Sequence, residues 1–204
     1  MRRVLICVAI EMEAKALARA LGLTFNSDRM SASGQLQPDL AVELKIVGIR
    51  ASHLPRQLDA THLTLVISAG LAGALDPALR VGDVVVDQIH SSDLVITTPA
   101  QKAAIFAQTG ARAVDMETGK IRQLARSANI PFTAIRAISD RADESINPLV
   151  LSLVDPLGRP RAAVVSSTLL RRPWLIPHLI HLRANSQRAL VVLARYLSDF
   201  LPGC

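Results

Sequence analysis

Three acidic side chains come directly after apolar stretches of this sequence. The stretch "ARAVDMETGK" ends its apolar part at Asp115 and Glu117, and "AIRAISDRADE" ends its own at Asp140. Carboxylates accept hydrogen bonds from hydroxyl groups and transfer protons, but they are seldom buried without a partner. Their position therefore indicates a ligand-binding or catalytic site.

The elements that must hold these acids alternate between strand and helix. We expect strands at 3–10, 40–48, 62–70, 83–88, 111–116 and 131–139, and helices at 11–22, 99–110 and 117–128. The polar segment 26–39 favours a loop or a weak hairpin. The alternation predicts an α/β fold of three α/β/α layers around a central mixed, largely parallel sheet. Without a repeat or linker, residues 1–204 are expected to form one domain.

Polar residues and glycines gather at the C-terminal ends of these expected strands. In open α/β sheets this edge is where ligands bind. Five separate groups point to the same edge, which makes a site there the strongest single prediction. The groups are Glu11 with Glu13, Gly48 with Arg50, Ser68 with Gly70 and Gly73, Asp115 with Glu117, and Asp140.

Composition favours a cytoplasmic protein. Half of the 204 residues are hydrophobic but only 3% are aromatic, so aliphatic side chains must form the core. No apolar run reaches the roughly 18–20 residues that span a bilayer, and no signal peptide is recognisable. Cys7 and Cys204 have neither disulfide nor metal spacing. We expect no metal site, although a magnesium site at Asp140, Asp143 and Glu144 is an alternative.

The positive charge is confined to the C-terminal segment. Residues 1–156 hold 16 basic and 16 acidic residues, whereas 157–204 hold seven arginines and one acid, Asp199, which gives the net +6. This basic segment is expected to be helical, with a core stripe in 186–201. Its part 169–183 combines Arg171, Arg172, Trp174 and aliphatic residues, which suits peripheral contact with an anionic membrane, such as the inner membrane.

Three motifs resemble the nucleoside phosphorylase and nucleosidase superfamily. They are "SAGLAGALDPALRVGDVVV", "AVDMET" and "PFTAIRAISDRAD", which occur in the family's order. The C-terminal segment further resembles the hopanoid-associated phosphorylase branch. The resemblance implies an enzyme that cleaves the N-glycosidic bond of a purine, and specifically an adenine, nucleoside, including a hopanoid-linked adenosyl lipid. A methylthioadenosine/adenosylhomocysteine nucleosidase is the alternative within the family.

The resemblance also assigns roles to residues. Glu117 would anchor the ribose hydroxyls, Met116 would lie against the ribose or base, and Asp140 would protonate the leaving purine. Ser68, Gly70 and Asp115 would complete the substrate site. For Asp115 a helix N-cap is the favoured interpretation.

The nucleophile stays open between water and phosphate. Glu13 matches the position that activates water in hydrolytic members. Gly48 and Arg50 are the candidates for phosphate binding, and the hopanoid branch is commonly labelled a phosphorylase. No cofactor is expected, apart from inorganic phosphate as a co-substrate. The segment 84–96 is shorter than in the family, which leaves the base specificity open.

Two other classes of function compete with an enzyme. A non-catalytic nucleoside-binding protein would keep the fold without needing Glu13, Glu117 and Asp140 together. A nucleic-acid binder would use the basic segment, but one Trp and one Tyr provide little for base stacking. We therefore expect a small-molecule nucleoside substrate and no nucleic acid. A homo-oligomer, specifically a dimer, is also expected.

Overall fold

The computed structural model describes residues 1–204 apart from the side chain of Leu151. Its helices are α1 (Glu11–Ala20), α2 (Pro99–Thr109), α3 (Thr118–Ser127), α4 (Ala162–Arg171) and α5 (Ile176–Phe200), with short 3-10 turns η1 (Ile49–Ala51), η2 (Pro148–Leu153), η3 (Pro173–Leu175) and η4 (Leu201–Gly203). Its strands are β1 (Arg2–Val8), β2 (Thr24–Asn26), β3 (Ser31–Gln37), β4 (Leu40–Ile46), β5 (Leu63–Ala74), β6 (Val84–Val86), β7 (Ile89–Ser91), β8 (Ala113–Asp115) and β9 (Phe132–Asp140).

All strands belong to one mixed sheet. Its main path runs β2-β3-β4-β1-β5-β8-β7, while β9 pairs with β5 and β6. The central pairs β1–β4, β1–β5 and β5–β9 are parallel, as is the outer pair β7–β8, so β1, β4, β5 and β9 end at the same edge. The predicted α/β class with a mixed, largely parallel sheet is confirmed.

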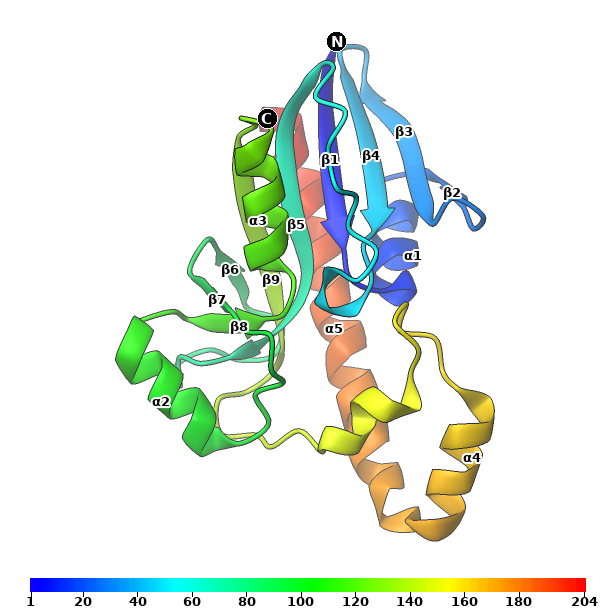
Figure 1. Ribbon diagram of the computed structural model, residues 1–204, viewed down its shortest axis with the longest axis vertical. Coiled ribbons are helices and arrows are strands. Elements are labelled where there is room, and N and C mark those ends of the chain that lie inside the picture. Colours follow the sequence, from blue (N-terminus) through cyan, green and yellow to red (C-terminus); the bar gives the residue numbers. More distant parts are fainter.

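Helices cover both faces of the sheet (Figure 1). On one face, α1 and α5 bury leucines such as Leu17, Leu193 and Leu197 against β1, β4 and β9. On the other face, Ile121 and Ala125 of α3 pack with Leu5 and Val66. The helical spacing of these residues explains the arrangement, because it puts one apolar stripe of each helix toward the strands.

Two expected elements differ from the structure. Segment 26–39 was expected to be a loop or weak hairpin; it does form a short hairpin with β2, but β3 is also a full strand paired with β4. The third strand was expected to end at Gly70, yet β5 continues to Ala74 because β9 and β8 keep pairing with it. Pairing with neighbours overrides the glycines, so Ser68 and Gly70 lie inside a strand and not at its end.

The C-terminal segment forms two helices that differ in their packing. The long helix α5 buries Leu190, Leu193 and Leu197, as its stripe predicts, whereas α4 has no buried residue. Pro173 lies in the turn between them, and Pro177 lies in the first turn of α5. Proline is tolerated there because the first N–H groups of a helix have no partner within it. In Figure 1 the two helices form a hairpin that projects away from the chain termini.

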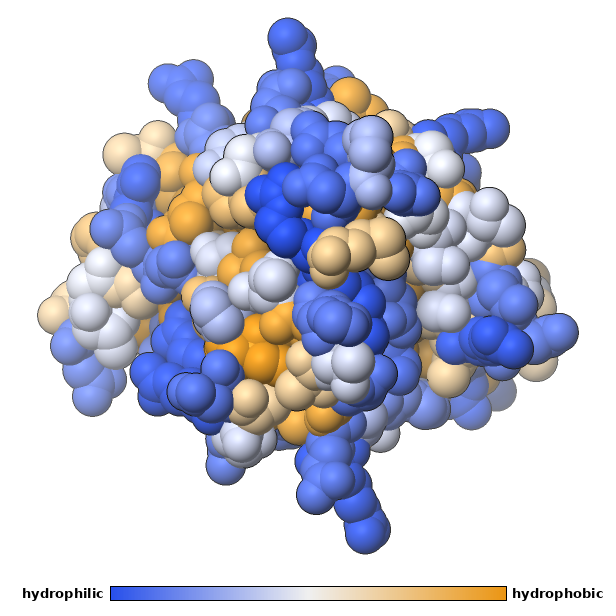
Figure 2. Space-filling view, turned by 90° about the horizontal axis from the view of Figure 1, so that it is seen from above, coloured by the Kyte–Doolittle hydropathy of each residue, from blue (hydrophilic) through white to orange (hydrophobic). Residues whose placement is uncertain are grey.

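Figure 2 shows the surface of the end of the molecule that carries both termini. Hydrophilic side chains stand out around its rim, and apolar residues show between them (Figure 2). Among the described residues, no helix combines the length and the hydropathy that crossing a membrane requires.

The packing of α5 predicts where substitutions destabilise the fold. Leu193 is fully buried while Val191, on the same helix, is 71% exposed. We expect Leu193→Ala to lower the free energy of unfolding by about 2–5 kcal/mol, because it leaves a cavity against the sheet. Val191→Ala should change it by about 0.5 kcal/mol or less. Urea unfolding of both variants measures the difference; similar losses would contradict the assigned packing.

Candidate active site

A cavity of about 290 Å³ opens at the sheet edge where the central strands end. Five of the predicted site residues line it: Glu13, Asp115, Met116, Glu117 and Asp140. They come from α1, β8, the turn before α3, and β9. The folded chain therefore brings together the acids that lie more than a hundred residues apart in the sequence.

Glu13 is buried at the start of α1. One carboxylate oxygen accepts hydrogen bonds from the backbone N–H groups of Ala9 and Ile10, at 2.9 and 3.1 Å. The other accepts from the N–H of Leu71, at 2.9 Å. Burial raises the pKa of Glu13, while the Leu71 N–H and the nearby guanidinium of Arg136 act in the opposite direction. Glu13 is thus a rigidly held carboxyl group that can gain or lose a proton at higher pH than usual.

Arg136, in the middle of β9, is the main residue that sequence reasoning missed. It is only 2% exposed, and its Nε and Nη2 donate to one oxygen of Asp115. Nη2 also donates to the hydroxyls of Ser68 and Thr118, at 2.8 and 3.1 Å. Burial alone would lower the pKa of Arg136, but the carboxylates around it raise it. A signal was present, since an arginine inside a buried strand requires a buried anion.

The remaining nitrogen of this guanidinium lies near Glu13. Nη1 of Arg136 is buried and has no hydrogen-bond partner among the described residues. A methyl group added at Gly70 would lie 3.2 Å from this Nη1 and 2.7 Å from the Glu13 carboxylate. Gly70 therefore allows Arg136 and Glu13 to approach each other closely. An unpartnered buried donor beside a carboxyl group is suited to holding a small polar molecule.

Asp115 and Glu117 have different environments. Asp115 accepts from Arg136 and from the backbone N–H and hydroxyl of Thr118, the first residue of α3, although the N-cap position itself is Glu117. Glu117 accepts the backbone N–H of Arg50, at 2.8 Å. Burial raises the pKa of Glu117 to about 7; Arg136 opposes this shift and Asp115 adds to it. Of the two, Glu117 keeps more of its hydrogen-bonding capacity for a ligand.

Asp140 has a buried cation beside it, which sequence reasoning also missed. Nζ of Lys102, on α2, lies 2.6 Å from Oδ2 of Asp140 and also donates to the backbone oxygens of Arg141 and Glu144. The hydroxyl of Ser139 donates to Oδ1, at 2.9 Å. Lys102 is completely buried. Lysines on short helices are usually solvated, so the sequence offered no signal for this pairing.

Ser68 and Gly70 lie behind the cavity. Ser68 is completely buried, and its hydroxyl accepts from Arg136. The structure thus connects Ser68 to the guanidinium and Gly70 to Glu13, and neither lines the cavity. A direct contact with a substrate stays a prediction for both.

Gly48 and Arg50 lie beside the site. Gly48 has φ +75°, and a side chain there would collide with Ser52 and His53, so a tight turn requires glycine. Arg50 reaches the site through its backbone N–H, while its side chain lines a separate cavity with Ser52 and Asp155. Phosphate binding by this turn stays a prediction.

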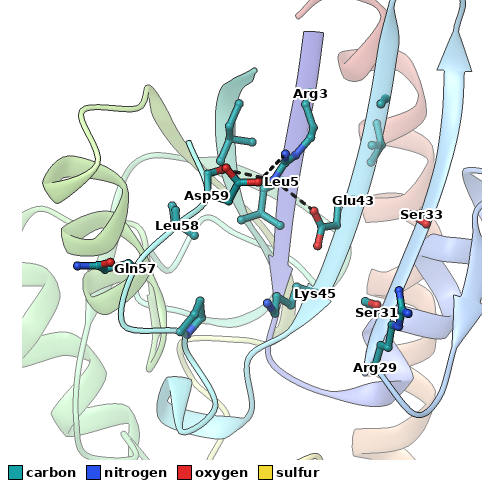
Figure 3. A pocket seen from close by; sticks show the side chains of 14 residues that line it. Arg3, Leu5, Arg29, Ser31, Ser33, Glu43, Lys45, Gln57, Leu58 and Asp59 are labelled. Atoms are coloured by element: carbon teal, nitrogen blue, oxygen red, sulfur yellow. Dashed lines mark hydrogen bonds and ion pairs between the residues drawn. The ribbon is translucent and has the colours of Figure 1, made fainter. Parts of the chain in front are cut away.

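A second cavity, of about 560 Å³, lies on the sheet face over β1, β3 and β4 (Figure 3). Three of its charged groups pair with one another, because Arg3 contacts both Asp59 and Glu43. No carboxyl group of the predicted set reaches it, so the smaller cavity is the candidate active site. Among the described residues, no group of three or more His, Cys, Asp or Glu side chains could hold a metal ion.

The Arg136 cluster predicts a stability effect. Arg136→Met should lower the free energy of unfolding by about 3–5 kcal/mol, because Asp115 would be left as a buried charge without its partner. Arg126→Met, on the exposed side of α3, is the matched control and should have little effect. Urea unfolding measures both. A loss for Arg136→Met as small as that of the control would show that the ion pair contributes little.

Comparisons with known proteins agree with the motifs. Residues 87–170 match the model of the phosphorylase superfamily. A segment of 75 residues is 35% identical to the 5'-methylthioadenosine/S-adenosylhomocysteine nucleosidase of Treponema pallidum. This match covers 37% of the chain and 28% of that relative's own length.

Solved structures share the fold over more of the chain. The futalosine hydrolase of Helicobacter pylori superposes with a TM-score of 0.71 at 14% identity, covering 100% of both chains. The 5'-methylthioadenosine/S-adenosylhomocysteine nucleosidase of S. pneumoniae gives 0.59 at 22% identity, covering 80% of this chain and 96% of its own. The family match therefore spans β8, α3 and β9, and the solved structures show that the fold of this chain is shared with these nucleosidases.

Proposed function

We propose that this protein is a nucleosidase that cleaves the N-glycosidic bond of a purine nucleoside, specifically an adenine nucleoside, by hydrolysis. The observation that carries the proposal is the meeting of Glu13, Glu117 and Asp140 in one cavity. A protein that merely bound nucleosides would not need all three acids there. The partial match to a nucleosidase supports the same reaction.

Glu117 is proposed to hold the sugar. Its carboxyl group accepts one hydrogen bond, from the Arg50 N–H, and therefore has capacity to accept two more from neighbouring ribose hydroxyls. With a pKa near 7, it becomes more anionic as pH rises through neutrality. That negative charge stabilises the positive charge that builds on the sugar as the bond breaks.

Glu13 and Arg136 are proposed to position the attacking water. The unpartnered Nη1 of Arg136 would donate to the water while Glu13 accepts its proton. Four carboxyl groups surround the site, with two buried cations between them: Arg136 pairs with Asp115, and Lys102 with Asp140. Such an acidic site repels a phosphate ion, which favours water as the nucleophile.

In its protonated form, Asp140 is proposed to deliver a proton to N7 of the purine, which leaves Asp140 as the carboxylate that pairs with Lys102. Ser139 and Lys102 each hold one of its oxygens, so the carboxyl group has a fixed orientation toward the cavity. Proton delivery helps because a purine leaves poorly as an anion. Lys102 acts through Asp140 and is a positioning residue in this scheme.

The outer wall of the cavity supports a substrate with an apolar 5' substituent. Ile10, Ile49, Leu94, Ile96 and Ile146 line this wall. Such a wall suits a methylthio group or a triterpenoid carried by the adenosine, as the resemblance to the hopanoid branch implies. The reaction needs no cofactor. A dimer in the cytoplasm remains the expected state.

The role of Asp140 can be tested with a single variant and with a double variant that leaves no buried charge unpaired. Asp140→Asn should lower the rate of adenine release from methylthioadenosine roughly 10²–10⁴-fold, the usual effect of losing a general acid. The double variant Asp140→Asn/Lys102→Met removes both charges of the buried pair and should fold at least as well as the single variant. It should be equally inactive. Normal turnover by a folded double variant would exclude Asp140 from the mechanism.

The nucleophile can be identified from the sugar product. With wild-type protein we expect the free sugar, at a rate that added phosphate does not change, and Glu13→Gln should abolish its formation. Arg50→Gln is the control and should keep hydrolytic activity. If a sugar 1-phosphate forms, and Arg50→Gln prevents it, the reaction is phosphorolysis and the hydrolytic proposal is wrong.

A further inference from the structure

The hairpin of α4 and α5 carries a surface that the proposed reaction does not use. Six of the ten residues of α4 are apolar, yet none is buried, and its main contacts are with the neighbouring turns η2 and η3. In Figure 1 the hairpin projects beyond the sheet, on the side where β1 and β4 end. An apolar helix that finds no core of its own needs another apolar environment.

Large apolar side chains gather at the tip of this hairpin, residues 170–180. Leu170 is 86% exposed, Trp174 69%, Ile180 64% and Ile176 41%. Ile176 and Ile180 are one helical turn apart, so they lie on the same side of α5. Trp174 stands in the turn between the two helices. Single exposed apolar residues are ordinary, but four of them within eleven residues form a patch.

The charges beside the patch are all positive. Arg171 and Arg172 are exposed at the tip, and among the described side chains neither forms an ion pair. From residue 157 to residue 198 the sequence contains no acid. Glu144 contacts His181 from outside the tip, 3.6 Å away. The tip therefore offers apolar groups and unneutralised arginines together.

We propose that the hairpin tip docks on the surface of an anionic lipid bilayer. Leucine and isoleucine side chains would enter the acyl boundary, the tryptophan ring would lie at the headgroup level, and the arginines would pair with lipid phosphates. A second copy of the chain fits less well, because a symmetric contact through the tip would set Arg171 and Arg172 against themselves. The inference stands independently of the proposed reaction.

The helix that carries part of the tip also reaches the candidate site. Leu182 and Ser186, further along α5, line the cavity of the candidate site. One helix thus connects the docking surface with the cavity wall. A substrate anchored in the same bilayer would be presented to the cavity without leaving the membrane surface.

The experiment uses the full chain and vesicles of phosphatidylcholine with or without phosphatidylglycerol. Co-sedimentation should occur with the anionic vesicles and weaken as salt is added. Arg171→Gln/Arg172→Gln should weaken it by about 30-fold, from about 1 kcal/mol for each arginine. Leu170→Ser/Ile180→Ser should weaken it as well. The matched controls, Arg126→Gln and Val191→Ser, change an exposed arginine and an exposed valine away from the tip and should bind like wild type.

The sequence provides its own probe, because Trp174 is its one tryptophan. Its fluorescence should shift to shorter wavelength with anionic vesicles and be quenched by brominated lipid. Thermal unfolding of each variant checks that the hairpin variants remain folded. No sedimentation with anionic vesicles at low salt would overturn the proposal. A fluorescence shift that follows protein concentration without lipid would assign the tip to a second copy of the chain instead.

Discussion

The buried guanidinium of Arg136 is the constraint on which the rest of the site depends. Asp115, Glu117 and Glu13 come from three different parts of the chain. Each of them raises the pKa of the Arg136 guanidinium. Without a cation at their centre, three carboxyl groups could not be buried together, because each would repel the others and lose its hydration. Nε and Nη2 of the guanidinium donate to Asp115. Nη1, on the other side, has no partner among the described residues and lies near Glu13.

Lys102 and Asp140 repeat this solution on a smaller scale. The ammonium joins α2 to the end of β9 and also holds the backbone that follows β9, through the oxygens of Arg141 and Glu144. The site is therefore built around two buried ion pairs. In each pair, an aspartate fixes the position of the cation. Glu13 and Glu117 have no such full partner, and burial raises the pKa of both. Glu13 and Glu117, whose pKa values are raised, are thus the carboxyl groups that can form hydrogen bonds with a ligand.

The sequence predicted the acids better than it predicted their partners. An acid near the end of an apolar run is visible locally, and so Glu13, Glu117 and Asp140 can be recognised from the order of residues alone. Lys102 cannot, because its burial depends on contacts between α2 and residues 38 to 42 positions away. The extension of β5 past Gly70 was missed for the same reason, since pairing with β8 and β9 decides it. Local pattern identifies which residues need a partner, whereas the topology decides which partner they obtain.

Helix α5 connects the tip of the hairpin with the candidate site. Its C-terminal half is fixed to the sheet by Leu193 and Leu197. Its second turn forms part of the cavity wall through Leu182, and its first turn carries Ile176 at the tip. The tip can therefore be exposed and apolar without loosening the site, since the core half of the same helix holds it in place. The proposed docking surface is then set at a fixed distance from the carboxyl groups of the candidate site.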